Sequence, residues 1–390
     1  MLDRMQLGEV PNKPHTQFRP AAHGGSLLYE HCLTRHGFDG AFTIAYRLHG
    51  PHVQTAWSAF EGPVVPMGPD AQSDALVLRR HYQSQLLESA TTPLMSRRAL
   101  LTSSDVELGV MRPTQSDTVY LENGDGDDLF YIQEGEGTLI TILGDIPFKS
   151  KDYVLVPRGL VHRFELAAGV PQHWFHIECK RDFHIPRQFR NESGQLKMDA
   201  PYTHRDFVRP TFSGPRDEGL RDVVVKREGR YTRFTYPNSP LDVVGWDGSV
   251  WPFAFPILAF QPKTSSVHLP PTIHGTFACG GGLICSFVPR LTDWHPDAIP
   301  CPYPHASVHC DEVIFYSEGN FTSRKGVGPG SISFHPMGTS HGPHPGSYAN
   351  SIGHTKTSEL AVMLDVFTPL RPTAYARALE DLNYHASFIP

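Results

Sequence analysis

The chain has 390 residues, of which 34 are glycine and 35 are proline, and its hydrophobic runs are short. This composition favours a β-rich protein with many turns over a helical bundle, and the length allows two domains with a well-buried core. The net charge of −6 is mild and comes without a basic stretch, which argues against nucleic-acid binding.

The beginning of the chain lacks the apolar core of a signal peptide. The most apolar window starts at Trp251, contains two prolines and is about half as long as a bilayer span, so we expect no membrane helix. The six cysteines form no CxxC pair and no disulfide framework, as is typical of reduced thiols. These features together predict a cytoplasmic protein.

In the N-terminal half, one helix is expected around residues 71–90. Strands follow it. Residues 131–132 and 138–144 are expected to form a β-pair, and residues 152–157 alternate in polarity and end at a proline.

The C-terminal half repeats this layout about 180 residues later. Residues 313–324 and 331–336 are rich in aromatic and β-branched residues, contain a Gly-bearing turn and again end at a proline. A second helix is expected around residues 372–385. The prediction is a mainly β protein with few helices.

The C-terminal repeat resembles cupin barrels, which carry two loose motifs that face each other across a small barrel. Gly330, Pro336, Gly338 and His341 match the second motif position by position. A histidine in the place of His341 is a metal ligand in that motif.

The first cupin motif precedes it. His305, Glu312 and Gly319 occupy its histidine, glutamate and closing glycine positions, and Ser307 stands where a second histidine would be. The two motifs therefore supply two histidines, His305 and His341, and one carboxylate.

The N-terminal half repeats both motifs in decayed form. Pro157, Gly159 and His162 match the second motif, but the first keeps only the acid Asp128, and its histidine position is Leu121. One histidine without a partner does not hold a metal well, so His162 is expected to be structural.

These repeats predict a bicupin, two jelly-roll-like β-barrels of which the first is degenerate. We expect an N-terminal β-rich domain over residues 1–245 and a C-terminal catalytic cupin over residues 246–390.

Two imidazoles and a carboxylate on one face of a divalent ion are the ligands of non-haem Fe(II) oxygenases, and they leave positions open for substrate and O2. A closed zinc site needs a fourth ligand, usually cysteine, and Cys310 is near. His309 is a rival ligand, whereas His335 is more naturally a neighbour and His344 lies outside the motif.

The segments PNKPHTQFRP, PLDVVGWDGSVWPF, VHLPPTIHGTF and FHPMGTSHGPH, with the His305 and Glu312 pair, resemble homogentisate 1,2-dioxygenase in a divergent, bacterial-type form. The resemblance implies Fe(II) held by His305, Glu312 and His341, and a catalytic histidine at His268. His274 competes with His268 for the role of base. The family uses O2 to open a hydroquinone ring in tyrosine breakdown, and its members form trimers or hexamers, so a homo-oligomer is implied.

One position departs from that family. Its better-known members carry a tyrosine nine residues after the ligand glutamate, and the tyrosine hydroxyl contacts the substrate carboxylate; here the residue is Phe321. Either Arg290 or Tyr316 receives the carboxylate, or the substrate has a different side chain. His335 is expected to hydrogen-bond a metal ligand or the substrate.

Two other functions stay open from the sequence: a metal-dependent cupin isomerase, and a ligand-binding bicupin without turnover. Oxygen uptake with hydroquinones distinguishes all three.

Overall fold

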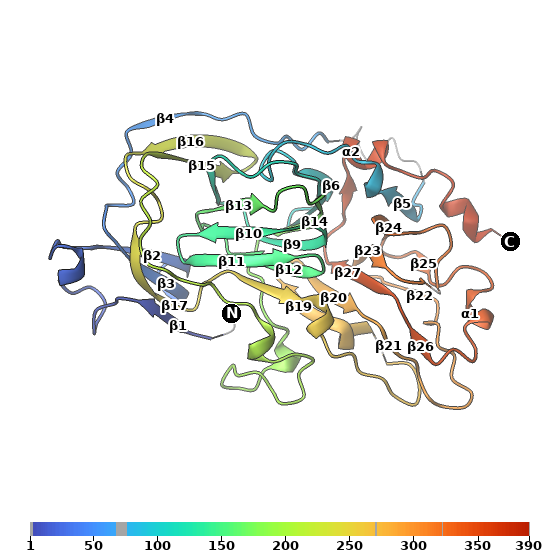
Figure 1. Cartoon of the computed structure of the whole chain (residues 1–390). Helices are drawn as coiled ribbons and strands as arrows, with labels where there is room; N and C mark the ends of the chain where they lie inside the picture. Colours follow the sequence, from blue (N-terminus) through green and yellow to red (C-terminus); the bar gives the residue numbers. More distant parts are fainter. Residues whose placement is uncertain (1–2, 68–75, 270, 322, 390) are drawn as a thin grey trace.

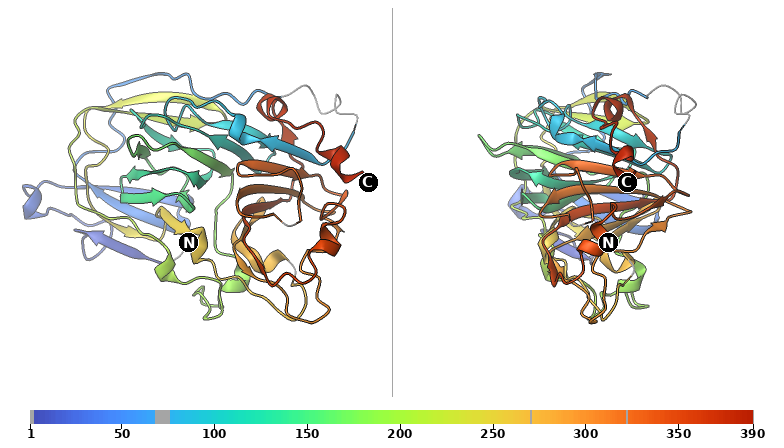
Figure 2. Two further views of the ribbon diagram at one scale, coloured as in Figure 1. Left: turned by 45° about the vertical axis from the view of Figure 1, so that its right-hand side comes forward. Right: turned by 90° about the vertical axis from the view of Figure 1, so that its right-hand side faces the viewer.

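The computed structural model describes residues 3–67, 76–269, 271–321 and 323–389. Strands dominate it, and the described residues contain two short α-helices, α1 (Ser347–Asn350) and α2 (Ala374–Ala378). Most N-terminal and central strands lie on the left of Figure 1 and the C-terminal strands on the right, where β5 (Arg80–Gln83) joins them. Figure 2 shows the two halves joined side by side in one elongated body. The expected mainly β, two-cupin fold is confirmed.

The N-terminal barrel is a sandwich of two seven-stranded sheets. The β10 sheet runs in the order β11 (Gly144–Lys149), β10 (Glu136–Thr141), β13 (His162–Leu166), β8 (Tyr120–Asn123), β15 (Arg221–Arg227), β16 (Arg230–Tyr236) and β4 (Ala56–Ala59). The β9 sheet runs in the order β18 (Phe253–Pro256), β12 (Asp152–Val156), β9 (Asp127–Glu134), β14 (His173–Cys179), β7 (Val106–Met111), β6 (Arg98–Thr102) and β28 (Arg371–Pro372).

Aromatic rings hold these two sheets together. Phe164 of the β10 sheet packs on Phe130 and Trp174 of the β9 sheet, with ring centroids 5.2 and 5.0 Å away. All three side chains are buried. Because full burial of such a ring contributes about 1.5–3 kcal/mol, this cluster is a main source of stability for the barrel.

The C-terminal barrel is built on one six-stranded sheet, the β23 sheet. Its order is β19 (Gly275–Cys279), β20 (Gly282–Phe287), β27 (Leu360–Val366), β23 (Asp311–Glu318), β24 (Ser331–His335) and β5 (Arg80–Gln83). Two ribbons complete this half, β21 (Arg290–Leu291) with β26 (Lys356–Thr357) and β22 (His305–Ala306) with β25 (Ser340–His341).

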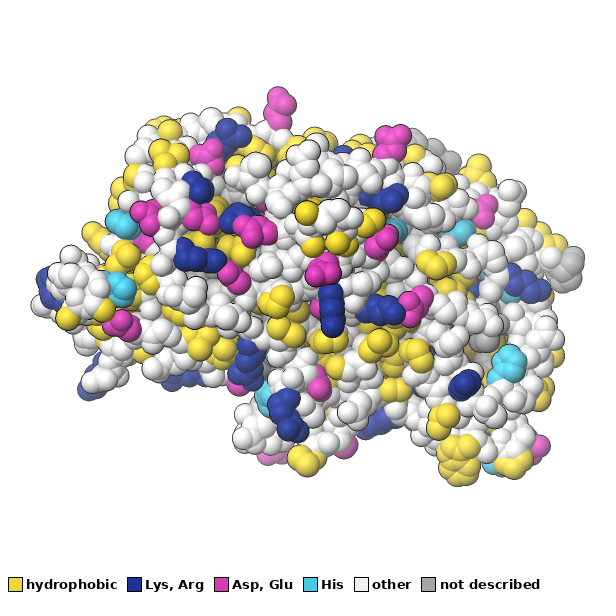
Figure 3. Space-filling view, in the orientation of Figure 1, with side chains coloured by type: hydrophobic (Ala, Val, Ile, Leu, Met, Phe, Trp, Pro, Cys, Tyr) yellow, Lys and Arg dark blue, Asp and Glu magenta, His cyan; other side chains and the backbone are white. Residues whose placement is uncertain are grey.

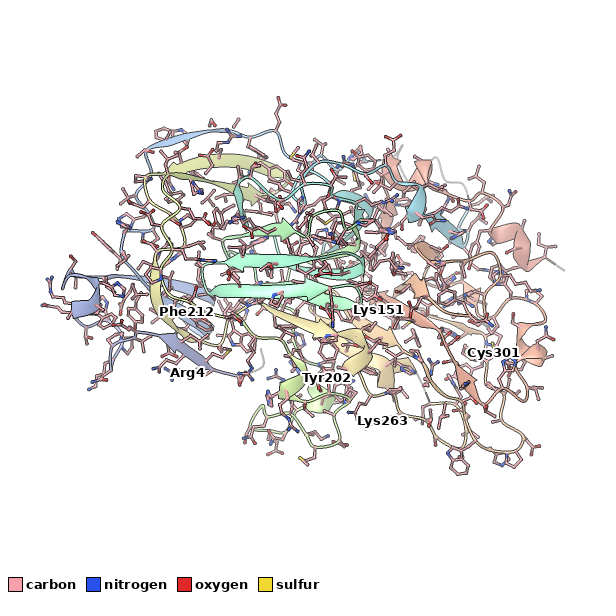
Figure 4. The ribbon with its side chains drawn as sticks, viewed as in Figure 1. Arg4, Lys151, Tyr202, Phe212, Lys263 and Cys301 are labelled. Carbon is pink, nitrogen blue, oxygen red and sulfur yellow. The ribbon has the colours of Figure 1, made fainter. Side chains whose placement is uncertain are left out.

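The β9 and β23 sheets pack against each other and join the barrels. Phe175 stacks on Phe315 with ring centroids 4.9 Å apart, and the hydroxyl oxygens of Tyr131 and Ser317 are 2.7 Å apart. At the edge of this contact Lys151, labelled in Figure 4, donates to Glu318 across 2.7 Å. The site in the C-terminal barrel is therefore supported from behind by the N-terminal barrel.

A separate four-stranded sheet contains β1 (Met5–Gly8), β17 (Val243–Gly248), β3 (Asp39–Arg47) and β2 (Tyr29–His36). The expected boundary between residues 245 and 246 falls inside β17. The division into residues 1–245 and 246–390 stays a prediction.

The helix expected around residues 71–90 is wrong where the structure describes it. Residues 68–75 lie outside the described part, and the rest forms β5 and the 3-10 turn Ser84–Leu86. β5 pairs with β24 and is buried, so pairing within the sheet overrides local helix propensity.

Two further expectations need correction. The helix around residues 372–385 is only the five-residue α2, because Gln83 of β5 donates to the carbonyl of Leu379 and draws the chain into the sheet. Residues 131–132 and 138–144 are not paired, since β9 and β10 belong to opposite sheets. Gly135, with a φ of 141°, redirects the chain between them.

Charged side chains of both signs are interspersed over the face shown in Figure 3. None of the helices formed by the described residues has the length and apolar character needed to cross a membrane.

Candidate metal centre and active site

His305, Glu312 and His341 meet at one end of the C-terminal barrel. His305 and His341 face each other across the β22–β25 ribbon, and Glu312 is the second residue of β23. Oε2 of Glu312 lies 3.7 Å from Nε2 of His305 and 3.6 Å from Nε2 of His341. The ligand atoms of the three residues all lie within 4.8 Å of one another.

His305 and His341 are each oriented by the backbone carbonyl of the residue two positions earlier. Nδ1 of His305 is 3.2 Å from the carbonyl of Tyr303, and Nδ1 of His341 is 3.0 Å from the carbonyl of Thr339. A proton on Nδ1 then leaves the Nε2 lone pair directed toward Glu312, as is usual for metal-binding histidines.

This donor set fits a divalent metal ion. Nitrogen and oxygen ligands at about 2.0–2.2 Å from one ion are themselves roughly 3–4 Å apart, which matches the separations observed. Nε2 of His341 is buried and has no hydrogen-bond partner among the described residues. An ion there would satisfy that nitrogen, and the two-histidine, one-carboxylate set is the one associated with Fe(II).

His335 lies behind Glu312 and is fully buried. Its Nδ1 is 2.8 Å from Oε1 of Glu312, so it fixes the carboxylate and directs Oε2 toward the other two histidines. Burial lowers the pKa of His335 to about 4, so it stays neutral. Burial alone would raise the pKa of Glu312, but the three histidines around the carboxylate, His305, His335 and His341, hold that pKa well below its ordinary value.

The rival ligands lie apart from this group. His309 is exposed, and burial raises the pKa of Cys310 to about 11, which disfavours a thiolate ligand. His344 packs on Phe388 with ring centroids 3.8 Å apart, and its Nε2 is 2.8 Å from the hydroxyl of Ser387.

His305 and Glu312 line a cavity of about 100 Å³. Apolar side chains form much of its wall, namely Phe287, Ile314, Phe321, Ala361 and Met363, with Pro300 and Pro302. His268, His274, Arg290 and Tyr316 also line it, so the structure brings most of the predicted residues together; His335 and His341 are not among the lining residues. We therefore place His335 against the ligand Glu312 and not against the substrate.

His268 and His274 differ in their surroundings. Nδ1 of His268 is 3.9 Å from a carboxylate oxygen of Asp293, while its Nε2 is buried with no hydrogen-bond partner among the described residues. Burial lowers the pKa of His268, and Asp293 opposes that shift. His274 packs on Phe287, and burial together with the charge of Arg290 lowers its pKa to about 3.

The predicted carboxylate-binding residues are already engaged. Arg290 donates to Glu359 across 2.9 Å, and the hydroxyl of Tyr316 is 2.9 Å from that of Ser333. Sequence reasoning missed Glu359 and Arg324, both of which line the cavity. The signal for Arg324 was its place in the loop between β23 and β24, two strands that carry site residues.

The N-terminal barrel shows the same geometry without the same chemistry. Leu121 faces His162 across paired strands, as His305 faces His341, and Asp128 is the second residue of β9. Nδ1 of His162 is 2.8 Å from the carbonyl of Leu160, in the same arrangement as His341.

Basic side chains contact the buried carboxylates of the N-terminal barrel. Arg97 donates to both carboxylate oxygens of Asp128, at 3.1 and 3.2 Å. Lys226 is hydrogen-bonded to Glu178, which with Asp128 and His176 forms a second group of potential ligands. Because the guanidinium of Arg97 and the ammonium of Lys226 are already present, the negative charge of this group is compensated without a metal.

Removing any residue of the His305 group should remove the metal. We expect His305→Ala, Glu312→Ala and His341→Ala each to lose most bound metal, because three ligands leave no redundancy. His335→Ala should lower metal affinity about 10–100-fold, as loss of a residue that orients a ligand does. Metal analysis of purified, iron-loaded variants tests this.

The control is His344→Ala, which changes a buried histidine outside the group and should keep its metal. Full metal content in Glu312→Ala would refute the ligand set.

Arg97→Met should destabilise the protein by about 3–5 kcal/mol, because it removes the guanidinium that pairs with both oxygens of the buried Asp128. Arg230→Met is the control, since it breaks an exposed pair with Glu228 that is worth at most about 1 kcal/mol. Urea unfolding measures both. Equal, small effects would show that Asp128 does not depend on the guanidinium.

Comparison with known proteins identifies relatives of this chain. A family model described as homogentisate 1,2-dioxygenase N-terminal matches residues 109–257. A Saccharolobus solfataricus protein named "Putative dioxygenase SSO1533" is 31% identical over 386 residues, which are 98% of this chain and 97% of that protein. A homogentisate 1,2-dioxygenase of Rhodopseudomonas palustris is 27% identical over 67% of this chain and 60% of its own length.

Among solved structures, a cupin 2 conserved barrel domain protein from Leptotrichia buccalis is similar to 75% of this chain, with 8% identity and a TM-score of 0.36. The full-length relative and the matching family model show that this chain is a dioxygenase-like enzyme and belongs to the homogentisate 1,2-dioxygenase family as a divergent member.

Proposed function

We propose that the protein is an Fe(II)-dependent ring-cleaving dioxygenase that acts on homogentisate or a related substituted hydroquinone. One observation carries the proposal: two histidines and a carboxylate converge beside a cavity whose wall includes several apolar side chains. The apolar wall suits an aromatic ring, and the ligand set suits an ion with positions open for substrate and O2.

Ferrous iron bound by His305, Glu312 and His341 would supply the open coordination positions and the electron transfer that O2 chemistry needs. The protein contributes a proton acceptor. His268 has Asp293 near Nδ1, so Nε2 is the nitrogen left to take the proton of a ring hydroxyl. The O–H bond breaks, an N–H bond forms, and the resulting phenolate is the better electron donor.

His268 suits this role better than His274. A histidine with a pKa of about 3 is a weak base at neutral pH, and the His274 ring is packed against Phe287. Asp293 keeps His268 more basic than burial alone would leave it.

We further propose that the enzyme works in the cytoplasm, in the breakdown of tyrosine or another aromatic compound, and as a homo-oligomer. A metal-dependent cupin isomerase and a non-catalytic ligand-binding bicupin are the alternatives.

Oxygen uptake separates these functions. Anaerobically iron-loaded protein should consume one O2 for each homogentisate or substituted hydroquinone added, and Glu312→Ala should consume none. An isomerase would convert substrate without O2, and a binding protein would do neither. Absence of uptake across a panel of hydroquinones, with iron shown to be bound, would refute the dioxygenase.

The pH dependence tests the base. His268 accepts a proton only when neutral, so kcat/KM should fall as the pH drops through its pKa, which burial places below the ordinary 6.5. Asp293→Asn removes a charge that raises this pKa and should move the acid limb to lower pH. His268→Ala should cost about 10²–10⁴-fold in turnover.

Iron content is measured across the same pH range, so that metal loss is not mistaken for titration of the base. An acid limb that does not move in Asp293→Asn, together with loss of activity in His274→Ala, would transfer the role to His274.

A further inference from the structure

We propose that Arg324 recognises the acidic side chain of the substrate, an assignment that rests on the proposed function. Phe321 stands where related enzymes carry a tyrosine whose hydroxyl contacts the substrate carboxylate. Because Phe321 has no hydroxyl, another residue of this chain has to bind that carboxylate. The ring of Phe321 packs against Tyr316, with centroids 4.8 Å apart, and both residues line the cavity.

The two residues first expected to bind the carboxylate, Arg290 and Tyr316, are engaged elsewhere. The charge of Arg290 is balanced by Glu359, and both side chains are largely buried, at 17% and 16% exposed. Tyr316 is bound to Ser333 and is itself buried. Neither offers a free positive charge to an incoming anion.

Arg324 differs because it forms no ion pair with a described residue, although the charge of Glu312 acts on it. Among the described residues no carboxylate lies within ion-pair distance of it, and its buried Nε has no hydrogen-bond partner. Its Nη1 donates to the carbonyl of Gly342, which follows the ligand His341. A guanidinium fixed in a cavity wall and lacking an anion is a site for a carboxylate.

The position of Arg324 also orients the substrate. Arg324, Ser323 and Gly342 line the cavity on the loop and ribbon side, whereas His268 and Arg290 come from other segments. A ring with one hydroxyl toward the metal ligands can then direct its acidic side chain to Arg324. Arginine replaces a neutral hydroxyl by a charged, forked donor, which favours acidic over neutral hydroquinones.

The test uses Arg324→Gln, which removes the charge but retains a donor for the Gly342 carbonyl. Lys325→Met is the matched control, because Lys325 is the adjacent cation, is exposed, and donates to the carbonyl of Pro345. Arg324→Lys keeps the charge.

Two measurements are made. Calorimetry on metal-free protein compares binding of 4-hydroxyphenylacetate with that of neutral 4-methylphenol. Oxygen uptake then gives kcat/KM for homogentisate and for methylhydroquinone.

Wild type should prefer the acid in both assays. Arg324→Gln should reduce that preference roughly 10- to 100-fold, the range expected for a hydrogen bond to a charged group. Lys325→Met should leave the preference unchanged, and Arg324→Lys should retain most of it.

An acid preference that survives in Arg324→Gln, or a wild type that binds both probes equally, would overturn the role of Arg324 while O2 uptake still supports the dioxygenase. A wild type that prefers the acid in calorimetry but consumes no O2 would overturn the proposed function and leave Arg324 as an anion site. Because calorimetry needs no metal, a loss of iron in Arg324→Gln does not obscure the result.

Discussion

Each barrel of this chain is organised around one buried carboxylate that requires positive charge. Glu312 is 5% exposed and Asp128 is fully buried, and each is the second residue of a central strand. An ionised carboxylate without compensation is costly in such surroundings. In the C-terminal barrel three histidines converge on the carboxylate and leave a place for a metal ion; in the N-terminal barrel Arg97 provides the compensating charge.

These two ways of compensating the buried carboxylate give the barrels different roles. A guanidinium is covalently part of the chain, so the N-terminal barrel cannot exchange its cation and serves as a scaffold. The opposite face of its β9 sheet presents Tyr131 and Phe175 to Ser317 and Phe315 on β23, the strand that carries Glu312. The geometry at Glu312 therefore depends on packing that begins in the other barrel.

The sequence could predict the fold class and which residues gather at the site, because motif spacing fixes the strand positions of His305, Glu312 and His341. It could not predict β5, since Arg80–Gln83 is a strand only through its partner β24, more than 200 residues away. The engagement of Arg290 by Glu359 was equally hidden, because an ion pair depends on side-chain distance and not on spacing.

The pairing of β5 with β24 also bears on how the site is held. Ser84, just after β5, donates to the carbonyl of Gly330, and its hydroxyl is 2.9 Å from Nε2 of His173 in the N-terminal barrel. Gly330 ends the loop that carries Phe321 and Arg324, and β24, which carries His335, begins directly after it. One hydroxyl thus fixes the end of the substrate-facing loop to the scaffold barrel. The cavity wall and the carboxylate behind it are therefore held by both barrels, which gives the N-terminal barrel a structural role although it lacks the C-terminal ligand set.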